Sequence, residues 1–229
     1  MDKNLASFNY DGRTFTFIVN DPSDVIQQHF LLGEFYEQRE LEVLRLCIPK
    51  GAVVVDVGTN VGNHAIYFDR IMQCSSVVCF EPNPTAIDLL RANVSLNQAA
   101  AVDLTHLGVG LGRGGGRAKL LFPQSHNIGA ARLDTSEDAN ATIVVDTMDN
   151  RIVDLANLDF IKIDAEGMEL DVLAGAVNII SSYRPTLLVE VEYRHRRAFA
   201  DWCDLNHYRI EHTFQRYQGV YNYLCVAKY

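Results

Sequence analysis

Residues 53–64 read Val-Val-Val-Asp-Val-Gly-Thr-Asn-Val-Gly-Asn-His. The β-branched run at the start is typical of a buried strand, and the two glycines that follow indicate a tight turn leading into a helix. Residues 76–80 form a second apolar run that ends in Phe80-Glu81-Pro82. A strand, a glycine turn, a helix and a further strand form the repeating unit of an open parallel sheet. The stretch therefore predicts a doubly wound α/β domain.

Gly58 and Gly62 stand where a ligand can approach the backbone closely. Glycine tolerates positive φ, and its missing side chain leaves room for the ligand. The helix that begins near Gly62 directs its free N–H groups toward the same crevice, at the carboxyl ends of the strands. Glu81 lies at the end of the next strand, where an acid accepts hydrogen bonds from ribose hydroxyls. These residues predict a site for an adenosine-containing cofactor.

The glycine spacing favours S-adenosylmethionine over NAD. The dinucleotide pattern G-x-G-x-x-G is absent, and Asp56 precedes the turn. A pyrophosphate would be repelled by Asp56, whereas the ammonium group of S-adenosylmethionine is attracted to an acid. The alternative is an ordinary strand-turn-helix whose glycines serve packing.

Composition limits the classes of function. The chain has 229 residues, 48% of them hydrophobic and 21% charged, and a net charge of −9. These values are typical of a globular protein, and the acidic balance argues against a nucleic-acid partner. We expect no signal peptide and no membrane span, and a cytoplasmic location. The odd number of cysteines, without a C-x-x-C pair, indicates buried thiols in place of a disulfide framework or a zinc site.

The pattern along the chain predicts one domain over residues 1–229, with an N-terminal hairpin and helical cap at 1–50 and the α/β core at 51–229. Asp11-Gly12 marks the hairpin, and a helical stretch continues to Pro49. Alternating elements that end in a hairpin predict a Rossmann-like, seven-stranded, mostly parallel sheet with one antiparallel strand and helices on both faces. The further predicted strands are 102–107, 118–122, 142–145, 160–164, 186–191, 208–213 and 221–226, and the predicted helices are 63–72, 85–96, 148–155, 169–180 and 195–206.

Two segments are predicted to be irregular. Residues 108–116 are rich in glycine but lack the Gly-Lys-Ser/Thr ending of a phosphate loop, so we interpret them as a turn. Residues 125–140 have the composition of an exposed loop.

Lys162, Asp164 and Glu166 follow one another at the end of an apolar strand. Parallel topology places this strand end beside that of residues 53–57. Two acids and a lysine at this position form a candidate acid/base site near the transferred methyl group. The alternative is a structural Lys–Asp pair with Glu166 at a helix start.

Three segments carry a resemblance to a known family. Val-Asp-Val-Gly-Thr-Asn-Val-Gly-Asn-His at 55–64, Phe-Glu-Pro-Asn-Pro at 80–84 and Ile-Lys-Ile-Asp-Ala-Glu-Gly-Met-Glu at 161–169 resemble the FkbM family of S-adenosylmethionine-dependent methyltransferases. The likeness extends over about residues 30–192. It departs from common family usage at Thr59 and at Asn63-His64.

The resemblance implies a class I methyltransferase fold and methyl transfer to a hydroxyl oxygen of a sugar or natural product, with S-adenosylhomocysteine as the product. The cofactor-binding residues it implies are Asp56, Gly58, Asn60, Gly62 and Glu81, and the neighbouring Thr59, Asn63 and Pro82 are further candidates for cofactor binding. Asp164 and Glu166 are then the candidate bases for the hydroxyl, with His126 and His195 as rivals and Lys162 as the residue that orients a carboxylate. Candidate substrate contacts are Tyr36, Glu37, His126, Asn127 and Glu190.

Several alternatives stay open at this point. Asp164, Glu190 and Glu192 offer oxygen atoms to a metal, but no compact ligand spacing is present, so we predict no metal. Methylation of nitrogen, of a protein or of a nucleic acid is a rival function, against which the acidic charge and the missing Asn/Asp-Pro-Pro-Tyr/Phe motif count. A non-catalytic cofactor-binding scaffold is the third possibility. We expect a small-molecule acceptor, and the sequence decides neither its identity nor the oligomeric state.

Overall fold

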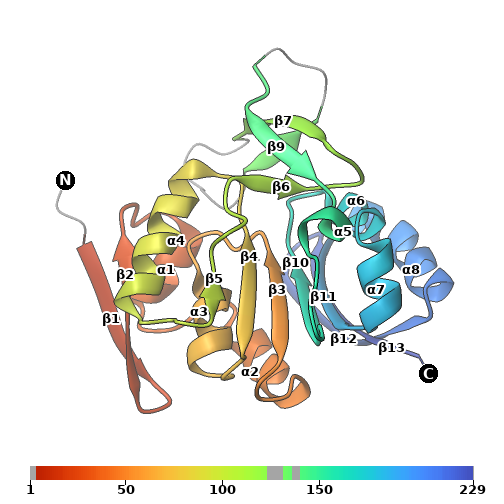
Figure 1. Cartoon of the computed structure of the whole chain (residues 1–229). Coiled ribbons are helices and arrows are strands. Elements are labelled where there is room, and N and C mark those ends of the chain that lie inside the picture. Colours follow the sequence, from red (N-terminus) through yellow and green to blue (C-terminus); the bar gives the residue numbers. More distant parts are fainter. Residues whose placement is uncertain (1–3, 123–130, 136–139, 229) are drawn as a thin grey trace.

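A computed structural model of the chain describes residues 4–122, 131–135 and 140–228. Its centre is a seven-stranded sheet with the strand order β12-β13-β11-β10-β3-β4-β5 (Figure 1). Of the seven strands of this sheet, β13 alone runs opposite to the others, which confirms the predicted mostly parallel sheet with one reversed strand. The strands are β3 (Val53–Val57), β4 (Ser76–Phe80), β5 (Val102–Asp103), β10 (Phe160–Ile163), β11 (Thr186–Glu192), β12 (Tyr208–Tyr217) and β13 (Val220–Ala227).

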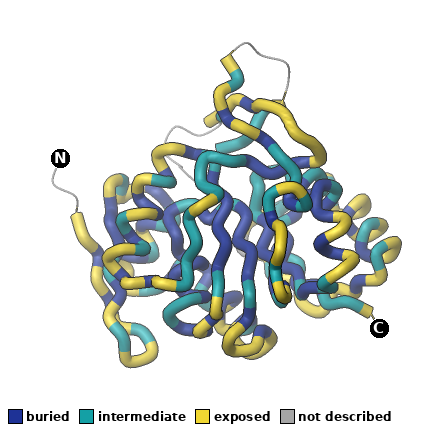
Figure 2. The backbone as a smooth tube through the Cα atoms, viewed as in Figure 1, coloured by how far each residue is buried: buried dark blue, intermediate teal, exposed yellow. Residues whose placement is uncertain are grey.

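Helices cover both faces of this sheet, whose central strands are buried along most of their length (Figure 2). Because side chains alternate between faces along a strand, Val54 packs into one core cluster and Val55 into the other. The first cluster includes residues of α1 (Val25–Leu31), α2 (Gln38–Cys47), α3 (Asn63–Arg70) and α4 (Pro84–Leu96). The second includes residues of α5 (Met148–Arg151), α6 (Glu169–Ala174), α7 (Val177–Tyr183) and α8 (Arg196–Leu205), which the 3₁₀ turn η2 (Tyr193–His195) precedes.

The predicted N-terminal hairpin is present as β1 (Asn4–Tyr10) and β2 (Arg13–Val19). Asp11 and Gly12 both adopt positive φ, as a two-residue hairpin turn requires. Two asparagines of α4 satisfy the backbone of β2. Asn93 Oδ1 accepts from the Ile18 N–H at 2.9 Å, and Asn97 bonds both the N–H and the C=O of Thr16, at 2.9 and 2.7 Å. The hairpin is thereby fixed to the domain through side-chain amides.

Replacing Phe17 with alanine is expected to lower the free energy of unfolding by about 3–5 kcal/mol. Phe17 is fully buried, and its ring stacks on that of Phe30 with centroids 4.0 Å apart. The cost is the lost burial plus the cavity left behind. Urea unfolding measures it, and Leu5→Ala on the neighbouring strand is the control, because Leu5 is 58% exposed. Equal losses in the two variants would contradict this account of the hairpin core.

A second, four-stranded sheet was not anticipated. Its order is β6-β9-β7-β8, and Figure 1 shows β6, β7 and β9 above one end of the central strands. The strands are β6 (Val109–Leu111), β7 (Gly116–Leu121), β8 (Arg132–Asp134) and β9 (Ile143–Asp146). The interpretation of residues 108–116 as a turn is therefore wrong at β6, and that of 125–140 as a loop is wrong at β8. The structure does not describe residues 125–130 and 136–139.

Close packing explains the glycine at the centre of β6. A Cβ added to Gly110 would lie 2.3 Å from Leu133 Cδ1, so the Leu133 side chain of β8 packs directly against this glycine. The sequence shows this glycine as a turn signal, although its role is a close approach between strands.

Other differences concern element ends. The predicted helix 169–180 is interrupted at Gly175, where a Cβ would lie 2.0 Å from the backbone oxygen of Gly112. The predicted strand 102–107 ends at Asp103, the helix predicted for 148–155 ends at Arg151, and the helical stretch before Pro49 is divided into α1 and α2.

Within the described residues, no helix has the length and apolar character needed to cross a membrane.

Candidate active site

A cavity of about 390 Å³ lies between the carboxyl ends of the central strands and the second sheet. Residues that follow β3, β4 and β10 line it together with residues of β6 and β8. The sequence-predicted residues among its lining are Tyr36, Gly58, Asn60, Glu81, Pro82, Asp164, Glu166 and Glu190. The cavity thus brings together residues from both of the motifs that the sequence singled out.

The turn after β3 is shaped by close backbone contact. Gly58 has a φ of +75°, and a Cβ there would lie 1.8 Å from the backbone oxygen of Asp164. The N–H groups of Gly58 and Thr59 both donate to the Phe80 carbonyl, at 2.9 and 3.2 Å. Gly62, with a φ of +93°, caps α3. These constraints join the ends of β3, β4 and β10 into one rigid rim.

Glu81 presents its carboxylate at this rim. Asn60 N–H donates to Oε2 and Asn83 N–H donates to Oε1, each at 2.8 Å. The two bonds fix the carboxylate and leave further lone pairs for ribose hydroxyls. Burial raises the pKa of Glu81 to about 7. Asn60 Oδ1 is buried and accepts no hydrogen bond from a described residue, so the rim also holds an open acceptor. This donor and acceptor set fits the adenosine part of S-adenosylmethionine.

Asp56 and Lys162 form a buried ion pair beside the cavity. They are register partners on adjacent parallel strands, and Lys162 Nζ lies 3.4 Å from Asp56 Oδ1 and 3.3 Å from Asp164 Oδ2. Burial alone would lower the pKa of the Lys162 ammonium, but Asp164 and Asp56 hold it above its usual value. Asp56 is fully buried and is not part of the cavity lining. Its carboxylate faces Lys162, which also contacts Asp164.

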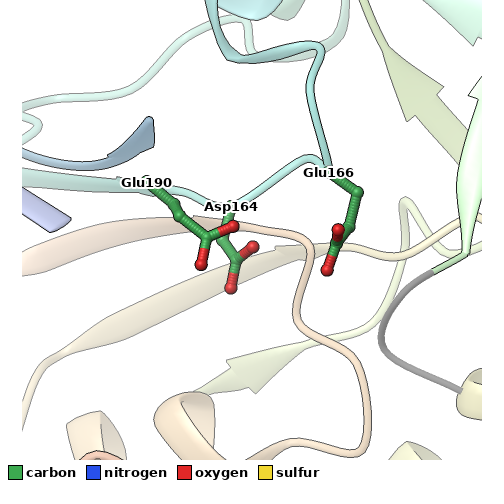
Figure 3. A group of neighbouring side chains, drawn as sticks. All are labelled: Asp164, Glu166 and Glu190. Atoms are coloured by element: carbon green, nitrogen blue, oxygen red, sulfur yellow. The ribbon is translucent and has the colours of Figure 1, made fainter. Parts of the chain in front are cut away.

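Asp164, Glu166 and Glu190 place three carboxyl groups in the same part of the cavity (Figure 3). One oxygen from each lies within 4.8 Å of the others. Burial and the Asp164 carboxylate raise the pKa of Glu166 to about 8, and the same two causes hold that of Glu190 well above its usual range. Three such groups do not all ionise together, because like charges at this distance disfavour one another.

The turn that carries Glu166 is fixed by its neighbours. Glu166 and Gly167 both have positive φ, at 52° and 100°. Glu169 at the start of α6 accepts hydrogen bonds from the N–H groups of Ala165, at 3.2 Å, and Gly167, at 2.8 Å. The Glu-Gly-Met-Glu sequence therefore forms a capped turn that directs Glu166 into the cavity.

The remaining predicted residues lie elsewhere. Thr59 donates to the backbone oxygen of Asp56, and Gly62, Asn63, Glu37 and His195 are not part of the cavity lining. His126 and Asn127 lie outside the described residues.

Several lining residues were not singled out from the sequence, among them Arg132, Leu133 and Met168. Arg132 donates to Glu192 Oε1 at 2.8 Å. It was missed because β8 is only three residues long and gives no periodic signal. Met168 was quoted within the motif at 161–169, but an apolar residue carries no chemical signal of its own.

The ligand-free protein is expected to lose stability as pH rises from about 5 to about 8. Burial raises the pKa of Glu81 and Glu169 to about 7 and that of Glu166 to about 8, from 4.5. Between these limits the folded protein holds protons that the unfolded chain has released, so the free energy of unfolding falls with pH. Thermal unfolding at a series of pH values measures the slope. Glu169→Gln should make this slope less steep. A free energy of unfolding that rises over this pH interval would contradict the raised pKa values of these glutamates.

Comparison with known proteins also indicates a methyltransferase. Residues 56–220 match the model of the methyltransferase FkbM domain. Methyltransferase sdnD of Sordaria araneosa is 27% identical, over 66% of this chain and 69% of that protein. The hexuronic acid methyltransferase AglP of Haloferax volcanii is 29% identical, over 62% of this chain and 59% of that protein.

Two crystal structures show the shared fold. That of methyltransferase FkbM from Methylobacillus flagellatus has a TM-score of 0.53 and 20% identity, covering 87% of this chain and 52% of that chain. That of the M. jannaschii tRNA m1G37 methyltransferase has a TM-score of 0.56 and 13% identity, covering 100% of this chain and 56% of that chain. With its family match over most of its length, the chain belongs to the FkbM family of methyltransferases.

Proposed function

We propose that the protein transfers the methyl group of S-adenosylmethionine to a hydroxyl oxygen of a sugar or another small molecule. The observation that carries this proposal is the group of three carboxyls, Asp164, Glu166 and Glu190, in the cavity that Glu81 and the Gly58 turn also line. A cofactor site and a candidate base thereby face the same space.

The cofactor's sulfonium supplies an activated methyl group when it is bound. Glu81 and Asn60 would hold the adenosine part, and the backbone at Gly58 would lie against the cofactor. The chain's other task is to bring the acceptor oxygen into line with the methyl group, which lowers the barrier mainly through orientation.

Glu166 is the proposed general base. An alcohol is a weak nucleophile, so removal of its proton during transfer accelerates the reaction. A carboxylate whose pKa is about 8 binds a proton more strongly than an ordinary glutamate and is still partly ionised near neutral pH. Lys162 Nζ lies 3.3 Å from Asp164 Oδ2, so Asp164 already pairs with a cation and is the less suitable base of the two. Glu166 Oε would accept the hydroxyl proton as the acceptor oxygen takes the methyl group that the bound cofactor would supply.

The lining suggests the chemistry of the acceptor. Arg132 places a guanidinium at the cavity, 40% exposed and anchored by Glu192, so an acidic sugar would find a counter-charge there. Val25, Ile26 and Leu133 supply apolar contacts. A relative that carries the name hexuronic acid methyltransferase adds support for a sugar acceptor.

A transfer assay with radiolabelled S-adenosylmethionine tests the proposal. The acceptor panel contains neutral hexoses, hexuronic acids and a polyhydroxylated polyketide, with bulk tRNA and a protein extract as rival substrates. Label that enters a small molecule through an ether or ester oxygen supports the proposal, and label confined to tRNA or protein contradicts it.

The same assay in EDTA tests the assignment of the carboxyls to proton transfer. Oxygens within 4.8 Å of one another also suit a divalent cation, so the two roles need to be separated. Full activity in EDTA supports the base assignment, and loss that Mg²⁺ or Ca²⁺ restores would assign these residues to a metal.

A further inference from the structure

Tyr36 lies in a short segment whose two neighbours are firmly held. Phe35 is fully buried and packs edge-on against Phe15, with ring centroids 4.9 Å apart. Glu37 has a φ of +57° and is 6% exposed, and its Oε2 lies 3.2 Å from His64 Nε2. Asn222 of β13 also donates to Glu37, at 3.4 Å. The backbone on either side of Tyr36 is therefore fixed by contacts with the core.

Asn63 holds Tyr36 itself. Its Oδ1 accepts from the Tyr36 N–H at 2.9 Å, and its Nδ2 donates to the Tyr36 carbonyl at 2.9 Å. Asn63 is 3% exposed and is the first residue of α3, directly after the Gly62 turn. Both polar atoms of its amide thus bond the backbone of one residue, and Asn63 is not part of the cavity lining.

The side chain of Tyr36 faces the cavity. Its hydroxyl lies 3.3 Å from that of Tyr217 on β12, so residues from opposite ends of the chain meet there. Burial and the charge of Glu37 raise the pKa of Tyr36 well above its usual value, with a smaller contribution from Asp164. The phenol therefore stays protonated and keeps a hydrogen to donate, and Tyr36 lines the same cavity as Asp164 and Glu166.

We propose that Asn63 is a positioning residue for methyl transfer: its amide holds the backbone of Tyr36 so that the phenol hydroxyl orients the acceptor beside Glu166. This inference rests on the proposed function. It differs from the sequence-based expectation, in which Asn63 binds the cofactor.

The chain contains a matched control for the test. Asn97 bonds the N–H and C=O of Thr16 with the same two-point geometry, at 2.9 and 2.7 Å. Thr16 lies on β2 and is not part of the cavity lining. Asn→Asp at either position keeps the oxygen that accepts from the backbone N–H. It replaces the amide nitrogen that donates to the backbone carbonyl with a second oxygen, which that carbonyl repels. The two variants therefore make the same chemical change at two positions. Only the change at Asn63 affects a residue of the cavity lining.

The experiment compares Asn63→Asp, Asn97→Asp, Tyr36→Phe and the Asn63→Asp/Tyr36→Phe double variant. With the acceptor that the wild type methylates, Asn63→Asp is expected to lower kcat by roughly tenfold to a hundredfold. The Kd for S-adenosylhomocysteine should change by less than about twofold, because a positioning role leaves cofactor binding intact. Asn97→Asp should lower Tm and leave kcat unchanged. The double variant should be no slower than Tyr36→Phe, because Asn63 acts through the tyrosine hydroxyl.

A readout without an acceptor accompanies the kinetics. Tetranitromethane nitrates accessible tyrosines, and peptide mass spectrometry locates the product. Tyr36 should be nitrated several-fold faster in Asn63→Asp than in the wild type or Asn97→Asp.

The outcomes separate the two proposals. Equal kcat and equal Tyr36 nitration in the two aspartate variants would overturn the positioning role, as would a large rise in the Kd for S-adenosylhomocysteine in Asn63→Asp. A wild type that binds the cofactor but methylates no acceptor would refute the proposed function, while the nitration comparison would still decide the role of Asn63.

Discussion

Alanine in place of Gly58 should lower the free energy of unfolding by about 3–5 kcal/mol and abolish S-adenosylhomocysteine binding. Two costs combine. A φ of +75° is unfavourable for an L-residue by about 1–2 kcal/mol, and the new Cβ would lie 1.8 Å from the Asp164 backbone oxygen, so β3 and β10 must separate. Since these strand ends form the cavity rim, the same displacement should remove the proposed cofactor site. Urea unfolding and calorimetric titration measure the two effects.

Gly219→Ala separates backbone strain from this collision. Gly219 has a φ of +86° but no heavy atom within 4 Å of an added Cβ, so the expected cost is only about 1 kcal/mol. Similar losses in the two variants would show that the contact between Gly58 and Asp164 does not constrain the protein.

Glu166→Gln should reduce kcat by about 10²–10⁴-fold and leave the Kd for S-adenosylhomocysteine nearly unchanged. Glutamine preserves the shape of the side chain but does not take up the hydroxyl proton. The pH profile gives a second readout. The proposed base is active as a carboxylate, so the wild-type rate should rise with pH up to about 8, the pKa to which burial and Asp164 raise Glu166. That rise should be absent in the variant.

Asp171→Asn is the control for this experiment. Asp171 lies on α6, the short helix that follows the Glu166 turn; it pairs with Arg113 at 2.9 Å and is 43% exposed, so its replacement should leave the rate unchanged. A Glu166→Gln variant that retains most of its turnover would assign the proton to another group, with Asp164 the first to test in the same way.

The sequence predicts the centre of the fold because its signals there are long and unambiguous. The apolar runs at 53–57 and 160–164 are interpreted as strands, and the structure pairs them in parallel with Lys162 opposite Asp56. Glu81 after β4 and Asp164 after β10 meet at one edge of the sheet, since parallel strands share their carboxyl ends. Glu166 reaches the cavity through the turn that Glu169 holds after β10.

The second sheet was not predicted because the residues that stabilise its short strands lie far from them in the sequence. The strands β6 and β8 have three residues each and are stabilised by pairing with distant segments. Gly110 gives a turn signal in the sequence, although its size serves contact with Leu133. Arg132 reaches the cavity only because this sheet forms.

Burial also decides roles that the residue type leaves open. Asp56 has the position expected of a cofactor-binding acid, yet it is fully buried against Lys162. Asn63 likewise follows the glycine turn, yet its amide bonds the backbone of Tyr36. Such pairings depend on strand register and on a segment 27 residues earlier in the chain, neither of which a motif contains.

The most direct test of this account is calorimetric titration of the wild type and of Glu81→Ala with S-adenosylhomocysteine, with NAD as the comparison ligand. The account predicts micromolar binding to the wild type, loss of that binding in a folded Glu81→Ala variant, and no binding of NAD. Failure of the folded wild type to bind S-adenosylhomocysteine, or undiminished binding to Glu81→Ala, would contradict the assignment of the cavity as the cofactor site.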